Sequence, residues 1–377
     1  MFIKKSLSIF ILLIPILGIY KVFNVNLDLL VLFFGFMLIL FLKNIYIEKK
    51  ILLFFFLFSF ISFLSIIFND KANISLFINN TLFFIIYSVL FSSIILNVNN
   101  LFSIKVLRIL GVFSTIILGI QFVLYNFFSL SQTFFLPLSL IEPPDKYFIA
   151  IEIGRPHSLF LEPAHYAIFI LPIFWLDLKS KKYLNAILYI IGLVLSTSTT
   201  GFAVSLILIA YYFLLKKVNF KNVVMFIFLI MLFSYSFMYF NDFFMKNINK
   251  LNGNQLEENI RIVGAMELIP YILDNHFFFG IGLNQMQSTF NIVNYSNSFL
   301  MIFISFGIIG ILLFIILLMY MFKQNNDIGL LIIFISILFT DQIIFNRNFF
   351  FLISTIYLFN NHENPIKNEK KYNIFLS

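Results

Sequence analysis

The chain contains no cysteine, and only 11% of its 377 residues are charged. The absence of cysteine excludes disulfide frameworks, thiolate metal sites and cysteine nucleophiles. An ordinary soluble domain has about 25% charged residues. The scarcity of charge therefore excludes a soluble globular enzyme.

Hydrophobic residues make up 61% of the chain, and phenylalanine alone accounts for 56 positions. A membrane-spanning helix needs about 20 mainly apolar residues, and polar breaks divide the sequence into segments near that length. The first segment follows two lysines as in a signal peptide, but no small-residue cleavage site follows it, so it is expected to remain as an anchor. We predict an all-α, polytopic membrane protein with a single membrane domain (1–377) and about twelve transmembrane helices, at 6–22, 27–42, 51–68, 76–96, 109–129, 164–178, 184–199, 201–215, 222–240, 298–322, 328–344 and 348–361.

The distribution of charge predicts the orientation of these segments. With the N-terminus in the cytoplasm, 17 of the 25 Lys and Arg residues fall on the inner side and 12 of the 17 acidic residues fall outside. Cytoplasmic loops of membrane proteins are enriched in Lys and Arg. We therefore expect both termini in the cytoplasm, and the net charge of +8 reflects topology, so no nucleic-acid partner is expected.

Two outer connections are long, whereas every inner connection is short. The first large outer loop spans 130–163, and the second spans 241–297. Apolar residues at helical spacing predict an amphipathic helix over 257–273 in the second loop. Such a helix lies on a membrane surface, a geometry that suits a protein handling lipid head groups.

The densest polar cluster runs from the first large loop into the sixth segment. It reads Arg155-Pro-His-Ser-Leu-Phe-Leu-Glu162-Pro163-Ala-His165-Tyr-Ala. Pro163 fits the first position of a helix, which places Glu162 at the cap and His165 one turn in, so the carboxylate and imidazole form a candidate acid/base pair. The alternative is structural: Glu162 complements the helix N-terminus, and Arg155 reaches the lipid phosphates.

Two further arginines are candidates for binding phosphate. Arg261 either pairs with the glutamates one turn back or clamps a phosphate, and Arg347 either pairs with Asp341 in a turn or does the same. Spacing alone leaves both alternatives open. No histidine pair has the spacing of a zinc site, so no metal is expected.

The order of these motifs resembles the O-antigen polymerase (Wzy-type) and O-antigen ligase superfamily. The resemblance covers about residues 100–345 and rests on the cluster above and on the motifs that follow it. These are the Ser/Thr-Gly turn at 196–201, Arg261 ahead of an amphipathic helix, His276-Phe-Phe-Phe-Gly280-Ile-Gly282-Leu-Asn284, and Asn297-Ser298-Phe-Leu before Phe306-Gly307-Ile-Ile-Gly310.

The resemblance implies a metal-independent membrane glycosyltransferase without a cofactor, acting on undecaprenyl-pyrophosphate-linked oligosaccharides at the periplasmic face of the bacterial inner membrane. It implies that Arg155 and Arg261 bind the donor pyrophosphate, with Arg347 as a third candidate. Glu162 and His165 are the catalytic candidates. Further substrate-binding candidates are His157, Asn284 and Asn297. Expected partners are the lipid-linked substrate, membrane lipid and a chain-length regulator protein.

One departure from the family pattern favours a polymerase. Ligases of this superfamily carry a histidine directly before the asparagine that opens the span after the large loop, and here Ser296 precedes Asn297. The alternatives are the ligase, a lipid-linked oligosaccharide flippase and a peptidoglycan-type polymerase. A flippase is expected to place charged residues within its spans and to need no long outer loop, which is the reverse of the pattern here.

Overall fold

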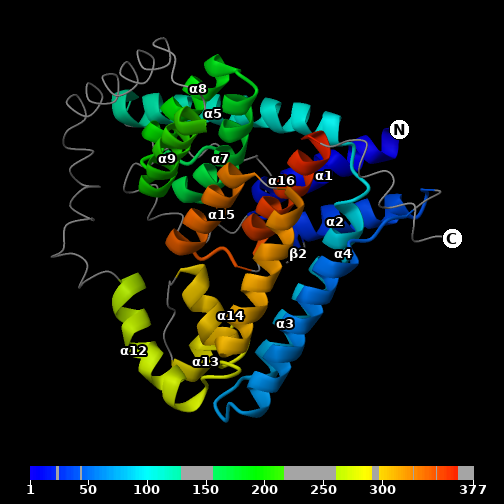
Figure 1. The fold of residues 1–377 in the computed structure, drawn as a ribbon, viewed down its shortest axis with the longest axis vertical. Coiled ribbons are helices and arrows are strands. Elements are labelled where there is room, and N and C mark those ends of the chain that lie inside the picture. Colours follow the sequence, from blue (N-terminus) through cyan, green and yellow to red (C-terminus); the bar gives the residue numbers. More distant parts are fainter. Residues whose placement is uncertain are drawn as a thin grey trace.

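The computed structural model describes residues 1–22, 25–42, 45–128, 156–215, 260–290, 297–325, 327–344 and 346–363. Helices dominate this part of the chain (Figure 1), and a short antiparallel ribbon joins the first two helices. The elements are α1 (Phe2–Leu17), β1 (Lys21–Val22), β2 (Val25–Asn26), α2 (Leu27–Ile39), α3 (Lys49–Ile67), α4 (Ile74–Ile94), α5 (Asn100–Phe128), α7 (Pro163–Lys179), α8 (Tyr183–Leu195), α9 (Thr199–Leu215), α12 (Ile260–Asn275), α13 (Met286–Phe290), α14 (Ser298–Asn325), α15 (Ile328–Thr340) and α16 (Arg347–Glu363).

Every predicted span except 222–240 coincides with one of these helices, and 222–240 lies outside the described residues. Four helices, α3, α4, α5 and α14, are long and apolar enough to cross a membrane. Five others, α2, α8, α9, α15 and α16, are apolar but shorter. The all-helical prediction is therefore confirmed for the described residues, whereas the count of twelve spans stays a prediction.

Short polar side chains define where several helices begin. The Asn73 side chain accepts a hydrogen bond from Leu76 N at the start of α4, and Asp327 accepts bonds from Gly329 N and Leu330 N at the start of α15. Such residues satisfy amide groups that the first turn leaves without partners.

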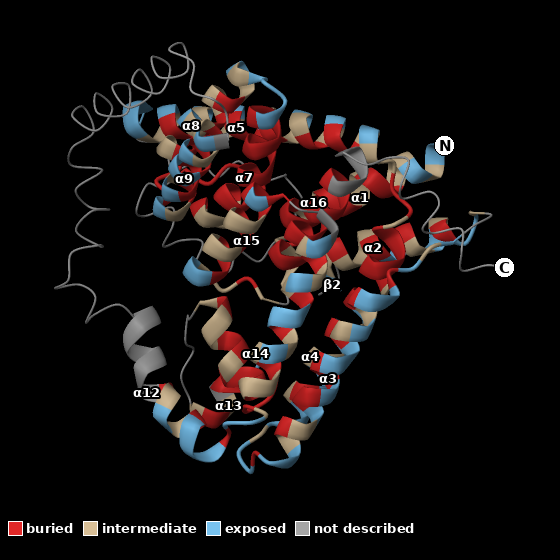
Figure 2. Cartoon of the chain, viewed as in Figure 1, coloured by how far each residue is buried: buried red, intermediate tan, exposed pale blue. Residues whose placement is uncertain are grey.

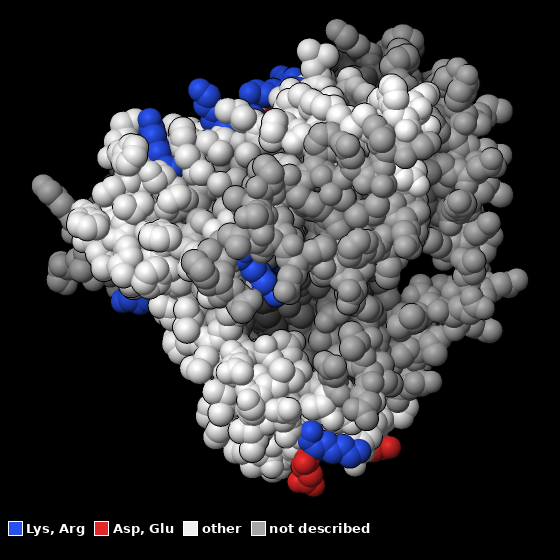
Figure 3. Space-filling model, turned by 180° about the vertical axis from the view of Figure 1, so that it is seen from behind, with Lys and Arg blue, Asp and Glu red and all other residues white. Residues whose placement is uncertain are grey.

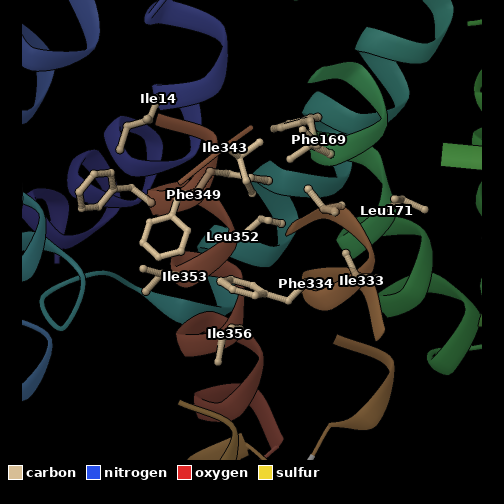
Figure 4. Close-up of a cluster of buried hydrophobic side chains, with 14 of the residues drawn as sticks. Ile14, Phe169, Leu171, Ile333, Phe334, Ile343, Phe349, Leu352, Ile353 and Ile356 are labelled. Carbon is tan, nitrogen blue, oxygen red and sulfur yellow. The ribbon is translucent and has the colours of Figure 1, made fainter. Parts of the chain in front are cut away.

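Two helices, α7 and α16, form the centre of the fold. Residues 166–178 of α7 and 348–359 of α16 are buried on every face, whereas α3, α4 and α5 expose many large apolar side chains (Figure 2). The rings of Phe169 and Phe351 stack with centroids 5.0 Å apart, and Figure 4 shows Phe169 close to Ile343, just before α16. A helix that is apolar all round is expected to be enclosed by others.

Charged side chains join helices and mark the ends of others. The ion pair Lys179–Asp327 (3.0 Å) and the Trp175 Nε1–Asp327 hydrogen bond (2.8 Å) join α7 to α15. Several Lys and Arg side chains lie along the upper edge of the face in Figure 3. The turn between α3 and α4 and the end of α12, which lie together at the bottom of Figure 1, carry the exposed residues Asp70, Lys71 and Asp274. The orientation of the chain in a membrane stays a prediction.

The apolar helix α14 is broken at Gly307, whose φ is +63°. The segment 277–282 fills the break by backbone pairing: Ile281 N donates to Ile304 O (2.8 Å), and Ile308 N donates to Phe277 O (2.9 Å). Gly280 and Gly282 have positive φ, as the predicted tight turn requires. The described part of the second loop is thus joined to α14 by hydrogen bonds.

The predicted amphipathic helix corresponds to α12 (Ile260–Asn275), and residues 257–259 of the prediction lie outside the described residues. Its buried face is formed by Leu268 and Ile272, which pack with Met301 and Ile304 of α14, whereas Leu273 is 48% exposed. The described end of α12 therefore faces α14. Residues 130–155 of the first predicted outer loop, and 241–259 and 291–296 of the second, lie outside the described residues.

Candidate functional site

The candidate site is built around the first turns of the two central helices. The α7 helix begins at Pro163, directly after Glu162, and α16 begins at Arg347. The Phe169–Phe351 stack joins the two helices about 9 Å and 6 Å, respectively, from these starting points, at 1.5 Å per residue. Both N-termini therefore lie close to this stack.

A buried glutamine of α5 holds the segment that leads into α7. Gln121 Oε1 accepts hydrogen bonds from His157 N (3.1 Å) and Ser158 N (2.6 Å), and its Nε2 donates to Ser158 O (2.9 Å). Ser158 Oγ also donates to Ser114 O (2.5 Å). These bonds fix the segment 157–158 although Ser158 has a φ of +59°. The sequence signal for Gln121 is its position as a polar residue inside the predicted span 109–129.

His157, a predicted substrate-binding residue, is only 4% exposed. Burial lowers the pKa of His157 from its ordinary value of 6.5 to about 4, because the charged imidazolium loses its hydration. The imidazole is therefore neutral near pH 7. In a substrate site it would act through hydrogen bonds rather than as a cation.

Glu162 and His165 lie on the first turn of α7 and are both partly buried. The backbone of Glu162 is extended (φ −142°, ψ 155°), and its side chain makes no capping hydrogen bond. Its carbonyl accepts hydrogen bonds from His165 N (3.0 Å) and Tyr166 N (3.3 Å). Tyr166 in turn bonds Thr115 of α5 (2.8 Å between the hydroxyls). The turn is thus anchored through its backbone and Tyr166, and the Glu162 carboxylate is not used for capping.

Arg347 lies against α1 and α2. It does not lie beside Asp341, the partner that its position in the sequence suggested. Its guanidinium interacts electrostatically with Asp28 and Tyr87, and Tyr87 Oη donates to Asp28 Oδ2 (3.2 Å). Among the described residues, Arg347 Nη1 and Asp28 Oδ1 are buried without hydrogen-bond partners. Such atoms are costly to bury, so the Arg347–Asp28 pair has one donor and one acceptor left unsatisfied.

Gly18, at the end of α1, leaves the space that Arg347 occupies. A Cβ atom at this position would overlap Arg347 Cδ and Nη1. The φ of Gly18 is −67°, so the backbone itself does not require glycine. The small residue is needed for the close approach of the arginine.

The remaining candidates lie on or next to α14, or fall outside what the structure describes. Asn297 caps α14 by accepting a bond from Leu300 N (2.9 Å), and the neighbouring Ser298 bonds Asp341 O, which joins α14 to the connection before α16. Asn284 is exposed with a φ of +55° in the turn after Gly282. Arg155 is outside the described residues, and Arg261 lies on α12 with its side chain not described.

Three groups were not predicted as neighbours: Gln121, Asp28 and Tyr87. The last two come from α2 and α4 and meet Arg347 of α16, so only the packing of three distant helices brings them together. The Ser/Thr-Gly turn at 196–201 is a break between α8 and α9, where Ser198 Oγ accepts a hydrogen bond from Gly201 N (3.2 Å). In the described part of the chain, no three His, Asp or Glu side chains are arranged to hold a metal ion.

Residues 184–315 match the sequence model of a family described as "O-Antigen ligase". This region of the chain is therefore similar to the O-antigen ligase/polymerase superfamily. No curated protein matches the chain. The matched region covers about a third of the sequence, from the start of α8 into α14, and it contains the predicted residues Arg261, Asn284 and Asn297.

The match supports the resemblance to the O-antigen ligase/polymerase superfamily drawn from the motifs. That superfamily consists of glycosyltransferase-like membrane enzymes, and four helices of this chain are long and apolar enough to cross a membrane, as a multi-pass protein of this kind requires. The matched region ends before α16 and begins after α7, so the central residues Glu162 and Arg347 lie outside it.

Proposed function

We propose that the protein is an O-antigen polymerase that joins undecaprenyl-pyrophosphate-linked repeat units on the periplasmic face of the bacterial inner membrane, with both termini in the cytoplasm. The family match supports the superfamily. The single observation that favours the polymerase is Ser296, which precedes Asn297 where ligases of the superfamily carry histidine. The ligase is the second candidate because the matched family is described by that name.

The proposed reaction is a glycosyl transfer without a metal or cofactor. A hydroxyl on the non-reducing sugar of one lipid-linked repeat unit attacks the anomeric carbon of the growing chain. The new C–O bond forms as the bond to the lipid pyrophosphate breaks, and the pyrophosphate leaves with the bonding electron pair. The hydroxyl proton passes to a base of the protein.

The leaving pyrophosphate needs positive charge. Arg155 and Arg261 are proposed to bind it, and Arg347 is the third candidate because its Nη1 donor has no hydrogen-bond partner among the described residues. The N-termini of α7 and α16, which both begin near the Phe169–Phe351 stack, carry partial positive charge. Cations aimed at the leaving group stabilise the charge that develops in the transition state.

Glu162 and His165 are the candidates for the base. Both are held on the first turn of α7, whose backbone is fixed by hydrogen bonds to the Glu162 carbonyl. A positioned base typically contributes about 10²–10⁴-fold to such a step. His157, Asn284 and Asn297 are proposed to bind the sugars by hydrogen bonds, and a partner protein is proposed to regulate chain length.

Deleting the gene distinguishes the two candidate functions. We expect the deletion strain to make lipopolysaccharide whose lipid core carries a single repeat unit, because ligation continues when polymerisation stops. Electrophoresis of the extracted lipopolysaccharide measures this result. A core without any repeat unit would instead identify the ligase, and a ladder of normal length would contradict both functions. Restoration of the ladder by a plasmid copy is the control.

Gly18→Ala is expected to displace Arg347 without removing its charge. We expect Arg347→Ala to lower polymer formation by about 10²-fold, as for removal of one transition-state donor, and Gly18→Ala to give a smaller loss in the same direction. The double variant should form as much polymer as Arg347→Ala alone. The added methyl group overlaps only the Arg347 side chain, so it has no further effect once that side chain is removed. Additive losses, measured from the lipopolysaccharide ladder at equal protein levels, would contradict this placement of Arg347.

A further inference from the structure

A groove of about 610 Å³ lies between α5 and α8 on the outside of the molecule. It is at the end that carries the Lys179–Asp327 ion pair, remote from the first turns of α7 and α16. Its polar lining consists of Lys105, Arg108, Lys182 and Asn185. None of the glycosyltransferase roles proposed above uses this groove, which we name the α5–α8 groove.

The rest of the lining is apolar and follows one face of α5. Its members include Ile109, Val112, Phe113 and Ile116, which recur at spacings of three and four residues. From Arg108 to Ile116 this face extends about 12 Å along the helix. The α5–α8 groove therefore joins a basic end to an apolar stripe, and its volume falls in the range of ligand sites, about 300–1,000 Å³.

The basic end is held in place by a buried carboxylate. Arg108 Nε donates to Asp177 Oδ1 (2.5 Å), and Asn185 Nδ2 donates to Asp177 Oδ2 (3.0 Å). Asp177 is fully buried and balances the charge of Arg108. Lys105 and Lys182 are exposed, and no carboxylate is among the described residues that line the groove. A net positive charge therefore faces the opening.

We propose that the α5–α8 groove binds an anionic phospholipid of the surrounding membrane. The lipid phosphate lies between Lys105, Arg108 and Lys182, and an acyl chain follows the apolar stripe of α5. Charge complementarity selects an anionic head group, and the stripe beside it selects a molecule that carries a hydrocarbon chain. The predicted topology places this end of the molecule on the cytoplasmic side.

The test compares two lipids with the same acyl chains on the full-length protein purified in a neutral detergent. We expect phosphatidylglycerol to raise the midpoint of thermal unfolding more than phosphatidylcholine does, because only the former has a net negative head group. Lys105→Gln with Lys182→Gln should abolish the difference. Lys181→Gln is the matched control, because Lys181 is exposed next to Lys182 but does not line the groove.

A second pair of variants tests the apolar stripe without changing charge. Ile109→Trp should fill the groove and remove the phosphatidylglycerol effect, whereas Ile120→Trp, on the same helix but outside the groove, should keep it. Both positions are exposed, 57% and 45%, so neither change disturbs the core. The proposal is overturned if the two lipids act equally, or if Lys181→Gln matches the double variant. It is also overturned if glycerol 3-phosphate alone gives the same shift, which would indicate a site for a free anion.

Discussion

Glu162→Gln is expected to abolish the lipopolysaccharide ladder, with a loss of transfer rate of about 10²–10⁴-fold. The substitution keeps the size of the side chain and removes its ability to take a proton. The Glu162 side chain makes no capping hydrogen bond, and the turn is held through its backbone carbonyl. The fold should therefore tolerate glutamine, and the loss would be one of chemistry. Electrophoresis of lipopolysaccharide at matched protein levels measures it.

Two comparisons make this result specific. Asp274→Asn removes an exposed carboxylate that has no proposed role and should leave the ladder unchanged. His165→Gln separates the two candidate bases. Of Glu162→Gln and His165→Gln, only the variant that lacks the true base should lose the ladder completely, and it should still bind the lipid-linked donor. A ladder of wild-type length from Glu162→Gln would show that the carboxylate takes no part, and the base would then be His165.

The helices could be predicted from the sequence because an apolar run of sufficient length is a local property. The spans at 51–68 and 76–96 correspond closely to α3 and α4, whose bounds follow from polar breaks and the Asn73 cap. The turn at Gly280 and Gly282 could be predicted for the same reason, since its two glycines are close in sequence. What such patterns do not contain is the partner of each element.

The candidate site illustrates this limit. Glu162, Pro163 and His165 are sequence neighbours, so their common turn is predictable from spacing. Arg347 has an acidic residue six positions away, which suggested a local pair, yet the structure places its charge near Asp28 and Tyr87. These residues belong to helices that are far apart in the sequence. Their association depends on how α2, α4 and α16 pack, which a single sequence does not reveal.

The break in α14 could not be predicted from the sequence either. The span 298–322 was predicted as continuous, because glycine is tolerated within transmembrane helices. The structure instead gives Gly307 a non-helical conformation and pairs the exposed backbone groups with the segment 277–282. Irregular backbone at membrane depth is stable only when its polar groups find partners within the protein. The glycine-rich turn supplies these partners, which gives the motif a structural role.

Gly280→Ala is accordingly expected to be among the most destabilising single changes in the chain, about 4–5 kcal/mol in the free energy of unfolding. The new Cβ would lie 2.5 Å from Ile304 O and from Phe306 N. Both contacts are with backbone, which cannot rotate away, and the φ of +69° adds strain for any residue with a side chain. The turn would have to leave α14, and the backbone groups at the break would lose their partners.

Gly119→Ala is the matched control for this prediction. A Cβ at Gly119 meets nothing within 4 Å, and alanine is favoured over glycine inside a helix by about 1 kcal/mol. Thermal unfolding in detergent should therefore show Gly119→Ala at or above the wild-type midpoint, with Gly280→Ala far below it or failing to fold. Gly307→Ala should behave like Gly280→Ala, because its Cβ would overlap the carbonyl of Phe278. If Gly280→Ala and Gly119→Ala unfolded at the same temperature, the turn would not pair with α14 as described.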